Sequence, residues 1–370
     1  MKVSLIANDT TYIYNLRKEV IEGLIKEGHQ VELICESLLY VDELEKLGCS
    51  IVKVNTGRHG TNPFADLALL QNYKKILKQS KPDIVLTYNI KPCSYGGMAC
   101  RMLKLPYMPN ITGLGTAVEN ASAIQKIAIM LYKLGVRNAK CIYFQNIDNQ
   151  KFFEDHNMIG KNTKVCLLPG SGVNLEKHKL LPYPEDDNII HFQFTSRILK
   201  EKGVDLYIEA ARIIHKIYPN TVFNICGGCD DDKYLQILED AEKEGCIKYH
   251  GQQKDIRPFL KQASCIVHPS YYPEGMSNVL LEAAASGRPI KATDRSGCRE
   301  TVDDGVTGYV IPIKNLDSLV KAIEKILSMS VEERKNMGLA GRKKMEQEFD
   351  RNIVVEAYLK EIDNLCALSI

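Results

Sequence analysis

The sequence contains no run of about 18 apolar residues, so it predicts no helix that spans a membrane. Its first residues, MKVSLIAND, form a short apolar run that ends at Asn8 and Asp9. They lack the basic leader, the long apolar stretch and the small-residue cleavage site of a signal peptide. We expect a buried strand there instead. The sequence also has no internal repeat of solenoid length and no low-complexity segment.

Patterns that bind metal ions are also scarce. Of the twelve cysteines, only Cys226 and Cys229 form a C-x-x-C pair, and no second cysteine or histidine pair accompanies them. We therefore expect no zinc site, and reduced thiols of a cytoplasmic protein. The acidic run from Asp230 to Asp232 follows two glycines at an expected helix start, where the helix dipole favours acidic side chains. We interpret it as a helix start rather than a metal site.

The bulk composition is that of a globular protein with two domains. The chain has 370 residues, of which 45% are hydrophobic and 25% charged. Residues 1–170 hold 21 basic and 15 acidic side chains, whereas residues 171–370 hold 27 and 31. The basic excess of the first half suits an anionic partner such as a diphosphate or a membrane surface, and ordinary surface charge is the alternative.

Short apolar runs alternate with helical patterns through most of the chain. Because these runs are apolar throughout, they are typical of parallel strands that are buried on both faces. The expected strands are 3–7, 31–35, 51–54, 83–88, 107–111, 141–144 and 164–168, then 189–194, 221–226, 246–250, 264–269, 288–293 and 308–312. The expected helices include 13–27, 64–79, 122–138, 203–217, 315–328, 331–346 and 352–366.

The pattern pauses at 176–188, where two prolines and a cluster of charges indicate a linker. The sequence therefore predicts an α/β fold with two tandem Rossmann-like domains, residues 1–175 and 188–350. In such sheets ligands bind beyond the carboxyl ends of the strands, at the switch point of strand order. We expect a site in the cleft between the two domains, but the fold alone does not decide the function.

The strongest motif runs from Tyr272 to Gly287 and reads YPEGMSNVLLEAAASG. It places Glu274 in a loop after an expected strand, Gly275 beside it at a tight turn, and Ser277 as the N-cap of a helix. A helix start next to a glycine binds phosphate well, because its first N–H groups are free. The donors that we expect belong to Met276, Ser277, Asn278 and Val279.

Glu282 lies eight residues after Glu274, within the same expected helix. Its carboxylate can accept hydrogen bonds from the two hydroxyls of a ribose beside such a phosphate. The alternative is an ordinary strand–helix unit with two solvated glutamates, which the glycine and the strand before it disfavour.

A second motif, FTSRILKEKGVD, follows the first strand of the second half. Arg197 and Lys202 stand five residues apart across this loop, so they can hold a diphosphate from two sides. Charge-assisted hydrogen bonds of this kind contribute about 1.5–3 kcal/mol each. Basic side chains near a helix start are mildly unfavourable, which favours a functional reason for them. Two ordinary surface cations are the alternative.

Together these motifs resemble family-4 glycosyltransferases of the GT-B fold. The likeness extends over ICGGCDD, YHGQQKDI and CRETVDDGVTGYVIP, and in the first half over LTYNIKP, YGGMA, NITGLGT and LLPGSGVN. The first-half motifs resemble bacterial enzymes that build capsule, O-antigen and other glycans on lipid diphosphate carriers. The resemblance implies a retaining transfer from a nucleotide sugar, usually UDP-linked, with no essential metal and no cofactor.

The resemblance also implies roles for individual residues. Arg197 and Lys202 hold the donor diphosphate, Glu282 holds the nucleotide ribose, and Glu274 lies beside the transferred sugar. In GT-B proteins the last helix usually returns to pack on the first domain, so we expect 351–370 to do so here. An N-acetylhexosamine donor, and a lipid-linked or oligosaccharide acceptor in bacterial surface polysaccharide synthesis, are further expectations from the resemblance.

The first half departs from the family pattern at one loop. Many members carry a histidine after the strand that corresponds to 83–88, whereas this chain reads YNIKP, so we assign no catalytic histidine. Asn89 and Lys91 remain candidates for contacts with donor or acceptor. The other candidates on the acceptor side of the cleft are Thr10, Thr11, Asn110, Thr112 and Gly113, and for each of them a purely structural role is the alternative.

Residues 123–140 combine an apolar stripe with basic residues. The stripe is Ile124, Ile127, Met130, Leu131 and Leu134. Such a helix suits the inner face of an anionic membrane, near a lipid-linked acceptor. The alternative is a helix that packs this stripe on the first sheet.

Front-face attack is the mechanism that we expect, because no nucleophile is evident: the acceptor hydroxyl enters on the side of the leaving group, and the departing phosphate takes its proton. Three other classes are weighed against a transferase. A nucleotide-sugar epimerase of the same fold needs acid–base residues that the motifs lack. A periplasmic binding protein needs export, and a nicotinamide dehydrogenase needs a G-x-G-x-x-G after the first strand.

Overall fold

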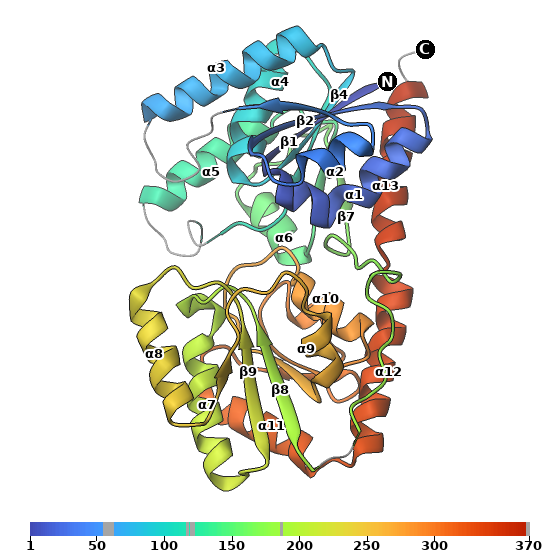
Figure 1. The fold of residues 1–370 in the computed structure, drawn as a ribbon. Coiled ribbons are helices and arrows are strands. Elements are labelled where there is room, and N and C mark those ends of the chain that lie inside the picture. The colour runs from blue at the N-terminus through green and yellow to red at the C-terminus, as the bar shows by residue number, and fades with distance from the viewer. Residues whose placement is uncertain (55–62, 116–117, 119–122, 186–187, 368–370) are drawn as a thin grey trace. The chain divides into compact units, whose positions relative to one another are not determined.

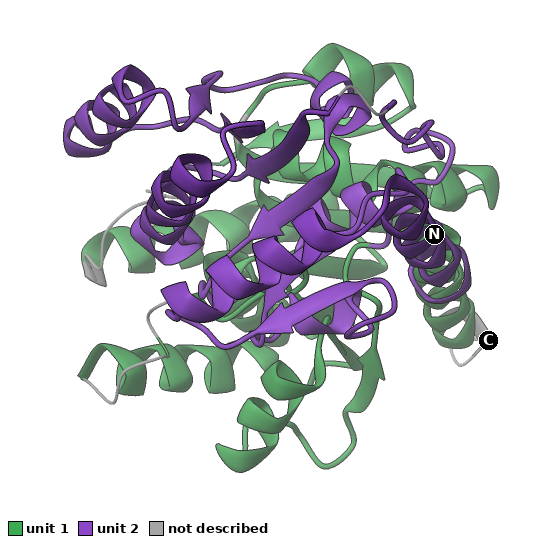
Figure 2. Ribbon diagram, turned by 90° about the horizontal axis from the view of Figure 1, so that it is seen from below, with its two compact units in different colours: residues 1–171, 274–276, 351–370 green, residues 172–273, 277–350 purple. Residues whose placement is uncertain are grey.

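The computed structural model describes residues 1–54, 63–115, 118, 123–185 and 188–367. The chain forms two compact units, which are coloured separately in Figure 2. Unit 1 comprises residues 1–171, 274–276 and 351–370, and unit 2 comprises residues 172–273 and 277–350. Unit 1 is therefore assembled from three separate stretches of the sequence.

Unit 1 is built on a parallel sheet of seven strands in the order β3-β2-β1-β4-β5-β6-β7 (Figure 1). The strands are β1 (Lys2–Asp9), β2 (Gln30–Ser37), β3 (Ser50–Lys53), β4 (Ile84–Tyr88), β5 (Tyr107–Ile111), β6 (Cys141–Phe144) and β7 (Lys164–Leu167). The helices are α1 (Thr10–Lys26), α2 (Val41–Lys46), α3 (Pro63–Ser80), α4 (Gly97–Leu103), α5 (Ala123–Val136), α6 (Ile147–Asp155) and α13 (Arg351–Ala367). Neighbouring strands thus follow the predicted strand–helix alternation.

Both faces of this sheet are buried, as its apolar strands predicted. Leu5 of β1 points into a core that α1 and α13 complete, whereas the next residue, Ile6, points into a core with α3, α4 and α5. Successive side chains of a strand project to opposite faces, so each strand contributes to both cores. Helices therefore cover the sheet on two sides, as in doubly wound folds.

Unit 2 repeats the plan with six parallel strands in the order β10-β9-β8-β11-β12-β13. The strands are β8 (Ile190–Thr195), β9 (Thr221–Cys226), β10 (Lys248–Tyr249), β11 (Cys265–His268), β12 (Ile290–Thr293) and β13 (Gly308–Ile311). The helices are α7 (Val204–Ile217), α8 (Asp232–Lys243), α9 (Arg257–Gln262), α10 (Asn278–Ala285), α11 (Leu316–Ser328) and α12 (Val331–Glu348). The predicted class, an α/β fold of two Rossmann-like domains, is confirmed.

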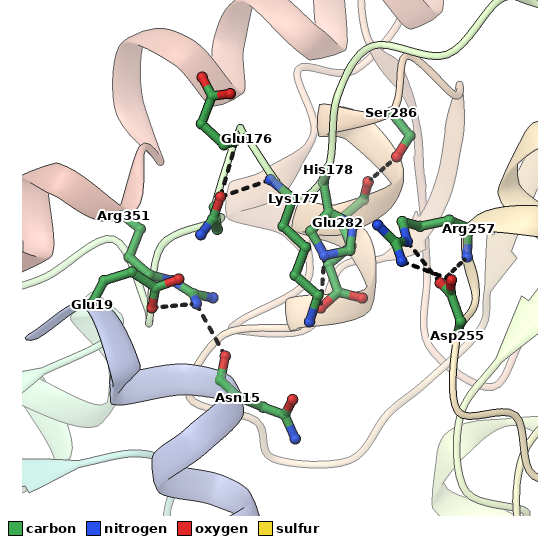
Figure 3. A network of polar contacts seen from close by, with 11 residues as sticks. Asn15, Glu19, Glu176, Lys177, His178, Asp255, Arg257, Glu282, Ser286 and Arg351 are labelled. Atoms are coloured by element: carbon green, nitrogen blue, oxygen red, sulfur yellow. Dashed lines mark hydrogen bonds and ion pairs between the residues drawn. The ribbon is translucent and has the colours of Figure 1, made fainter. Parts of the chain in front are cut away.

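The last helix, α13, packs in unit 1 although it follows unit 2 in the sequence. Val354, Tyr358 and Ile362 are fully buried in the same core as β1 and α1. At its start, Arg351 donates from Nη1 to the Glu19 carboxylate at 2.8 Å and to the Asn15 carbonyl at 3.0 Å (Figure 3). Buried apolar side chains and a half-buried ion pair therefore hold α13 on α1.

The stretch expected as a linker is fixed along unit 2 over residues 176–185, and residues 186–187 lie outside the described residues. Arg342 donates to the His178 carbonyl at 2.8 Å, and Arg288 donates to the Pro182 carbonyl at 2.6 Å. The Tyr183 hydroxyl donates to the Ser264 carbonyl at 2.7 Å. Arg288 is fully buried, so its hydrogen bonds anchor this stretch from beneath.

Candidate functional site

In unit 2 the strand order reverses between β8 and β11, which lie side by side in the middle of the sheet. Loops 196–203 and 269–277 leave the carboxyl ends of these two strands. Ligands of doubly wound sheets bind at this reversal, because the two loops diverge there to opposite sides. The two motifs that the sequence singled out therefore occupy the two loops of the switch point.

Direct contacts join these two loops. The Tyr271 N–H donates to the Glu201 carbonyl at 2.8 Å. Gly203 has a φ of +78°, and a Cβ there would lie 2.2 Å from the Pro269 carbonyl oxygen. Only glycine fits this position, since both its backbone conformation and the approach of Pro269 exclude a side chain. The glycine after Lys202 thus holds the basic loop against the loop that follows β11.

The two predicted phosphate-binding cations differ in their surroundings. Arg197 is exposed, and no other described residue forms a hydrogen bond or ion pair with its guanidinium. Lys202 is buried, and its ammonium lies 4.6 Å from the centre of the Tyr272 ring. Such a cation–π contact holds a charge in place without neutralising it. The loop therefore presents one exposed cation and one buried, positioned cation.

Beneath this loop lies a buried histidine whose role the sequence did not reveal. His268 is the last residue of β11, and its Nε2 lies within hydrogen-bond distance of the Ser277 hydroxyl, at 3.4 Å. Burial lowers the pKa of His268 to about 3, and the nearby Lys202 charge lowers it further in the same direction. The imidazole is therefore neutral at physiological pH.

The start of α10 has the geometry of an anion site, with one correction to the prediction. Ser277 is the N-cap residue, but its hydroxyl bonds to His268 instead of capping the helix. Its N–H donates to the Gly297 carbonyl at 2.7 Å, so it is unavailable to a ligand. Within the described part of the chain, no acceptor pairs with the N–H groups of Met276, Asn278 and Val279. Three of the four expected donors are thus available.

Glu282 lies one turn further along α10 and is half-buried. Its carboxylate is 3.8 Å from Nε2 of His178, which is buried and belongs to the stretch expected as a linker (Figure 3). The histidine therefore lies beside one side of the carboxylate, which remains partly accessible. No periodicity of the sequence marks His178, because it stands in an irregular segment about a hundred residues before α10.

The predicted residues Glu274 and Gly275 are grouped with unit 1. The Asn146 side chain donates to the carbonyls of Glu274 at 3.2 Å and Gly275 at 2.5 Å. A Cβ on Gly275 would lie 2.4 Å from the Thr112 carbonyl oxygen, so only glycine permits this approach. Glu274 and Gly275 are therefore brought together with Thr112 and its neighbour Gly113, which the sequence assigned to the acceptor side.

In unit 1 the strand order reverses between β1 and β4. The Asn8 N–H, near the end of β1, donates to Oδ1 of Asn89 after β4 at 3.2 Å. Asn89 has a φ of +69°, a conformation that asparagine tolerates better than most residues. The predicted residues Asn89 and Thr11 thus lie at the switch point of this sheet, and Thr11 is half-buried in the first turn of α1.

Three of the residues expected to contact a ligand also form contacts within the protein. Thr10 is buried, and its hydroxyl donates to the Leu39 carbonyl. Lys91 forms an ion pair with Asp66 at 3.1 Å. Asn110 is buried in β5, and its amide donates to the Tyr358 hydroxyl of α13. These contacts place the three side chains against neighbouring elements of the fold, and their contact with a ligand stays a prediction.

The acidic run at 230–232 has the structural role that the sequence indicated. Asp231 is the N-cap of α8, and its carboxylate accepts from the Lys233 N–H at 2.9 Å. In the described ranges, no cluster of three or more His, Cys, Asp or Glu side chains is placed to hold a metal ion.

Helix α5 buries only part of the apolar stripe that the sequence showed, since Leu131 packs on the core but three other members are exposed. Its buried residues are Tyr132, Gly135 and Val136, whereas Ile124, Ile127 and Met130 are 58%, 52% and 54% exposed. A pocket of about 250 Å³ adjoins this face, between α5 and the turn 157–160. The lining residues are Met130, Lys133, Leu134, Arg137, Asn157, Met158, Ile159 and Gly160. Among the described helices, none is both long and apolar enough to cross a bilayer.

Two protein families match successive parts of the chain. Residues 2–146 match the family described as glycosyl transferase 4-like, and residues 175–344 match the family described as glycosyl transferases group 1. The two matches lie almost entirely in unit 1 and unit 2 respectively.

Two curated relatives cover most of the chain. One is the N,N'-diacetylbacillosaminyl-diphospho-undecaprenol alpha-1,3-N-acetylgalactosaminyltransferase of Campylobacter jejuni, 26% identical over 99% of both chains. The other is the UDP-Gal:alpha-D-GlcNAc-diphosphoundecaprenol alpha-1,3-galactosyltransferase of Escherichia coli, 27% identical over 82% of each.

Among solved structures, sucrose-phosphate synthase from Thermosynechococcus elongatus superimposes with a TM-score of 0.80 at 18% identity, over the full length of both chains. This likeness concerns the fold. The chain therefore belongs to the family-4 glycosyltransferases and has their GT-B fold.

Proposed function

We propose that this glycosyltransferase transfers an N-acetylhexosamine, with retention, from a UDP-sugar to a lipid-linked or oligosaccharide acceptor. The reaction belongs to bacterial surface polysaccharide synthesis. The names of both curated relatives support a lipid diphosphate acceptor. The name of the first supports an N-acetylhexosamine as the transferred sugar, and the name of the second supports UDP as the nucleotide of the donor. The donor is a co-substrate, and no cofactor is required.

One observation supports the donor site above all: the loops after β8 and β11 meet at the switch point of unit 2, joined by the bond from Tyr271 to Glu201. In our proposal Arg197 and Lys202 hold the donor diphosphate. The N–H groups of Met276, Asn278 and Val279 bind its oxygens, since a helix start attracts anions. Glu282, held by His178, accepts the ribose hydroxyls.

These donors also account for catalysis without a metal ion. As the bond between sugar and phosphate breaks, negative charge grows on the diphosphate, and donors fixed beforehand stabilise that charge. The acceptor hydroxyl attacks from the face that the phosphate leaves, and the phosphate takes the hydroxyl proton. Glu274 lies beside the transferred sugar, and its backbone is held by Asn146. On the acceptor side, the candidates are Thr10, Thr11, Asn89, Lys91, Asn110, Thr112 and Gly113.

We further propose that the enzyme works in the cytoplasm and binds the inner face of the membrane through α5. The exposed apolar residues of this helix lie beside the exposed cations Lys126, Lys133 and Arg137. An apolar face flanked by positive charge suits the surface of an anionic bilayer. This placement brings a lipid-linked acceptor to the protein without a spanning helix.

Thermal unfolding with UDP, GDP or ADP, with and without EDTA, tests the donor site. A ligand that binds only the folded state stabilises it by about 2.7 kcal/mol at a hundred times its dissociation constant. We expect UDP, but not GDP or ADP, to raise the melting temperature, and by the same amount with and without EDTA. Glu282→Ala should abolish the shift, whereas Glu239→Ala, an exposed change on α8, should keep it. The proposal is contradicted if none of the three nucleotides raises the melting temperature. It is also contradicted if the rise requires a divalent cation.

A second measurement separates a transferase from an epimerase. With a UDP-sugar and a lipid diphosphate acceptor, a transferase releases UDP only when the acceptor is present. An epimerase converts the UDP-sugar to its isomer without any acceptor.

A further inference from the structure

Two cysteines of unit 1 lie in direct contact on neighbouring strands. Cys141 begins β6, and Cys166 lies in β7 opposite Tyr143, two residues further along β6 than Cys141. Side chains two residues apart on a strand share a face, so both thiols project from the same side of the sheet. Their sulfur atoms are 3.3 Å apart, with the Cys141 thiol donating to Cys166.

The two thiols differ in their access to solvent. Cys141 is 1% exposed and belongs to the core that α13 covers. Cys166 is half-buried on β7, the edge strand of the sheet. The reactive form of a cysteine is its thiolate, which must reach solvent to meet a reagent. Cys166 is therefore the accessible partner, and Cys141 lies directly behind it.

The contact between the two sulfur atoms shifts the pKa values of the two thiols in opposite directions. The hydrogen bond from Cys141 lowers the pKa of the Cys166 thiol against the effects of burial and of the Glu361 carboxylate, which raise it, and the charges of Lys164 and Lys360 also lower it. That hydrogen bond, together with burial, raises the pKa of the Cys141 thiol. The negative charge of the pair thus forms on the sulfur that faces solvent.

We propose that Cys141 and Cys166 form a reactive dithiol, a modification site that small disulfides such as oxidised glutathione convert to an intramolecular disulfide. The Cys166 thiolate attacks one sulfur of oxidised glutathione, which forms a mixed disulfide and releases one glutathione thiolate. Cys141 then loses its proton to solvent and attacks Cys166 Sγ, which forms the Cys141–Cys166 bond and releases the second glutathione. The protein gives up two electrons and two protons, and oxidised glutathione is reduced to two thiols.

The second step is favoured once the first has occurred. In the mixed disulfide Cys166 carries no charge, so the thiolate that raised the pKa of Cys141 is gone. The sulfurs are already in contact, and the edge strand β7 is bonded to the sheet on one side only, by β6. Closure therefore needs a small movement of one strand rather than a rearrangement of the unit.

Peptide mapping of the folded full-length chain tests this site. After exposure to oxidised glutathione, free thiols are alkylated and the chain is digested with trypsin. The peptides 141–151 and 165–177 each contain a single cysteine, so their disulfide-linked pair is identified by mass. We expect this pair to form about tenfold faster than the glutathione adduct of Cys229, the other half-exposed cysteine of the described residues.

Two variants separate the steps. Cys141→Ser should leave a lasting glutathione adduct on Cys166, because no second thiol displaces it. Cys229→Ser is the matched control and should form the linked peptides at the rate of the natural chain. Cys166 reacting no faster than Cys229, or linked peptides that join other cysteines in comparable amount, would overturn the proposal.

A measurement on the unaltered chain guards against variants that fail to fold. Phenylarsine oxide bridges two thiols only where they lie close together. We expect one equivalent to protect peptides 141–151 and 165–177 together from alkylation, with excess dithiol reagent restoring both. Protection of neither peptide, or of one without the other, contradicts the proposed pair.

Discussion

The residues of the basic loop illustrate what a sequence motif does and does not contain. TSRILKEKG predicted that Arg197 and Lys202 would follow the first strand of unit 2, and both do. The sequence did not show that Lys202 is buried against Tyr272, because that ring stands seventy residues later. Nor did it show His268 beneath the loop, since a histidine within an apolar strand carries no signal of its partner.

The two cations should both matter for turnover. Removing a charge-assisted hydrogen bond costs about 1.5–3 kcal/mol, so we expect Arg197→Ala and Lys202→Ala each to lower kcat/KM about tenfold or more. Steady-state release of UDP measures the effect. Lys200→Ala, an exposed lysine two residues before Lys202, is the control and should retain the natural rate. Near-normal turnover in both variants would refute the assignment of the diphosphate site.

For Glu282 too, the motif predicted the position of the residue but not its partner. Its position on α10 follows from the motif alone, but its partner His178 comes from a stretch whose prolines and charges predicted a linker. The stretch is held by the buried Arg288 and by Arg342, which donate to its carbonyl groups. Backbone acceptors of this kind leave no trace in the pattern of side chains, so the sequence could not predict them.

At the scale of elements, apolar runs predicted every strand, because a buried parallel strand must be apolar on both faces. Helix α5 shows why helix faces are harder to predict. The sequence allowed its stripe of large apolar residues to pack on the sheet. Instead α5 packs through Tyr132 and the smaller Gly135 and Val136, and Ile124 and Ile127 are left exposed. Gly135 permits the approach, since a Cβ there would lie 2.5 Å from the Cα of Ser94.

The exposed face of α5 yields a prediction about lipid binding. In flotation with vesicles that contain anionic phospholipid, we expect Ile127→Glu to reduce binding strongly, because it places a negative charge in the apolar face. Ile217→Glu, which alters an equally exposed isoleucine at the end of α7, should bind as the natural chain does. Equal loss in both variants, or equal binding to neutral vesicles, would show that α5 is not the lipid-facing element.

At the scale of the molecule, the sequence predicted two sheets, but the strand orders and the three-part composition of unit 1 needed the structure. Unit 2 also contains a buried cation that no motif marked. Lys291 is fully buried opposite Tyr309, its ammonium 3.3 Å from the centre of that ring. No hydrogen-bond partner for this nitrogen exists among the described residues. Burial lowers the pKa of Lys291 to about 7.

This lysine should make stability depend on pH. The unfolded chain keeps Lys291 protonated up to a pKa near its ordinary value, about 10.4, whereas the folded chain releases the proton above about 7. At this site the unfolded state then binds more protons, so the contribution of Lys291 to stability rises from pH 7 to about 10. We expect Lys291→Met to remove this slope and to raise the free energy of unfolding at pH 7 by about 1 kcal/mol or more. Urea unfolding of both chains across this range measures the difference, and parallel curves contradict it.

The three-part composition of unit 1 has a consequence for synthesis on the ribosome. Val354, Tyr358 and Ile362 complete the core that begins with β1, yet they are translated only after all of unit 2. Domains made early in translation usually fold first. Here the order is reversed: the unit whose translation starts first is finished last. Until α13 emerges, the first sheet of the nascent chain has an apolar face that α13 does not yet cover. Unit 2 can complete its own core before unit 1 can.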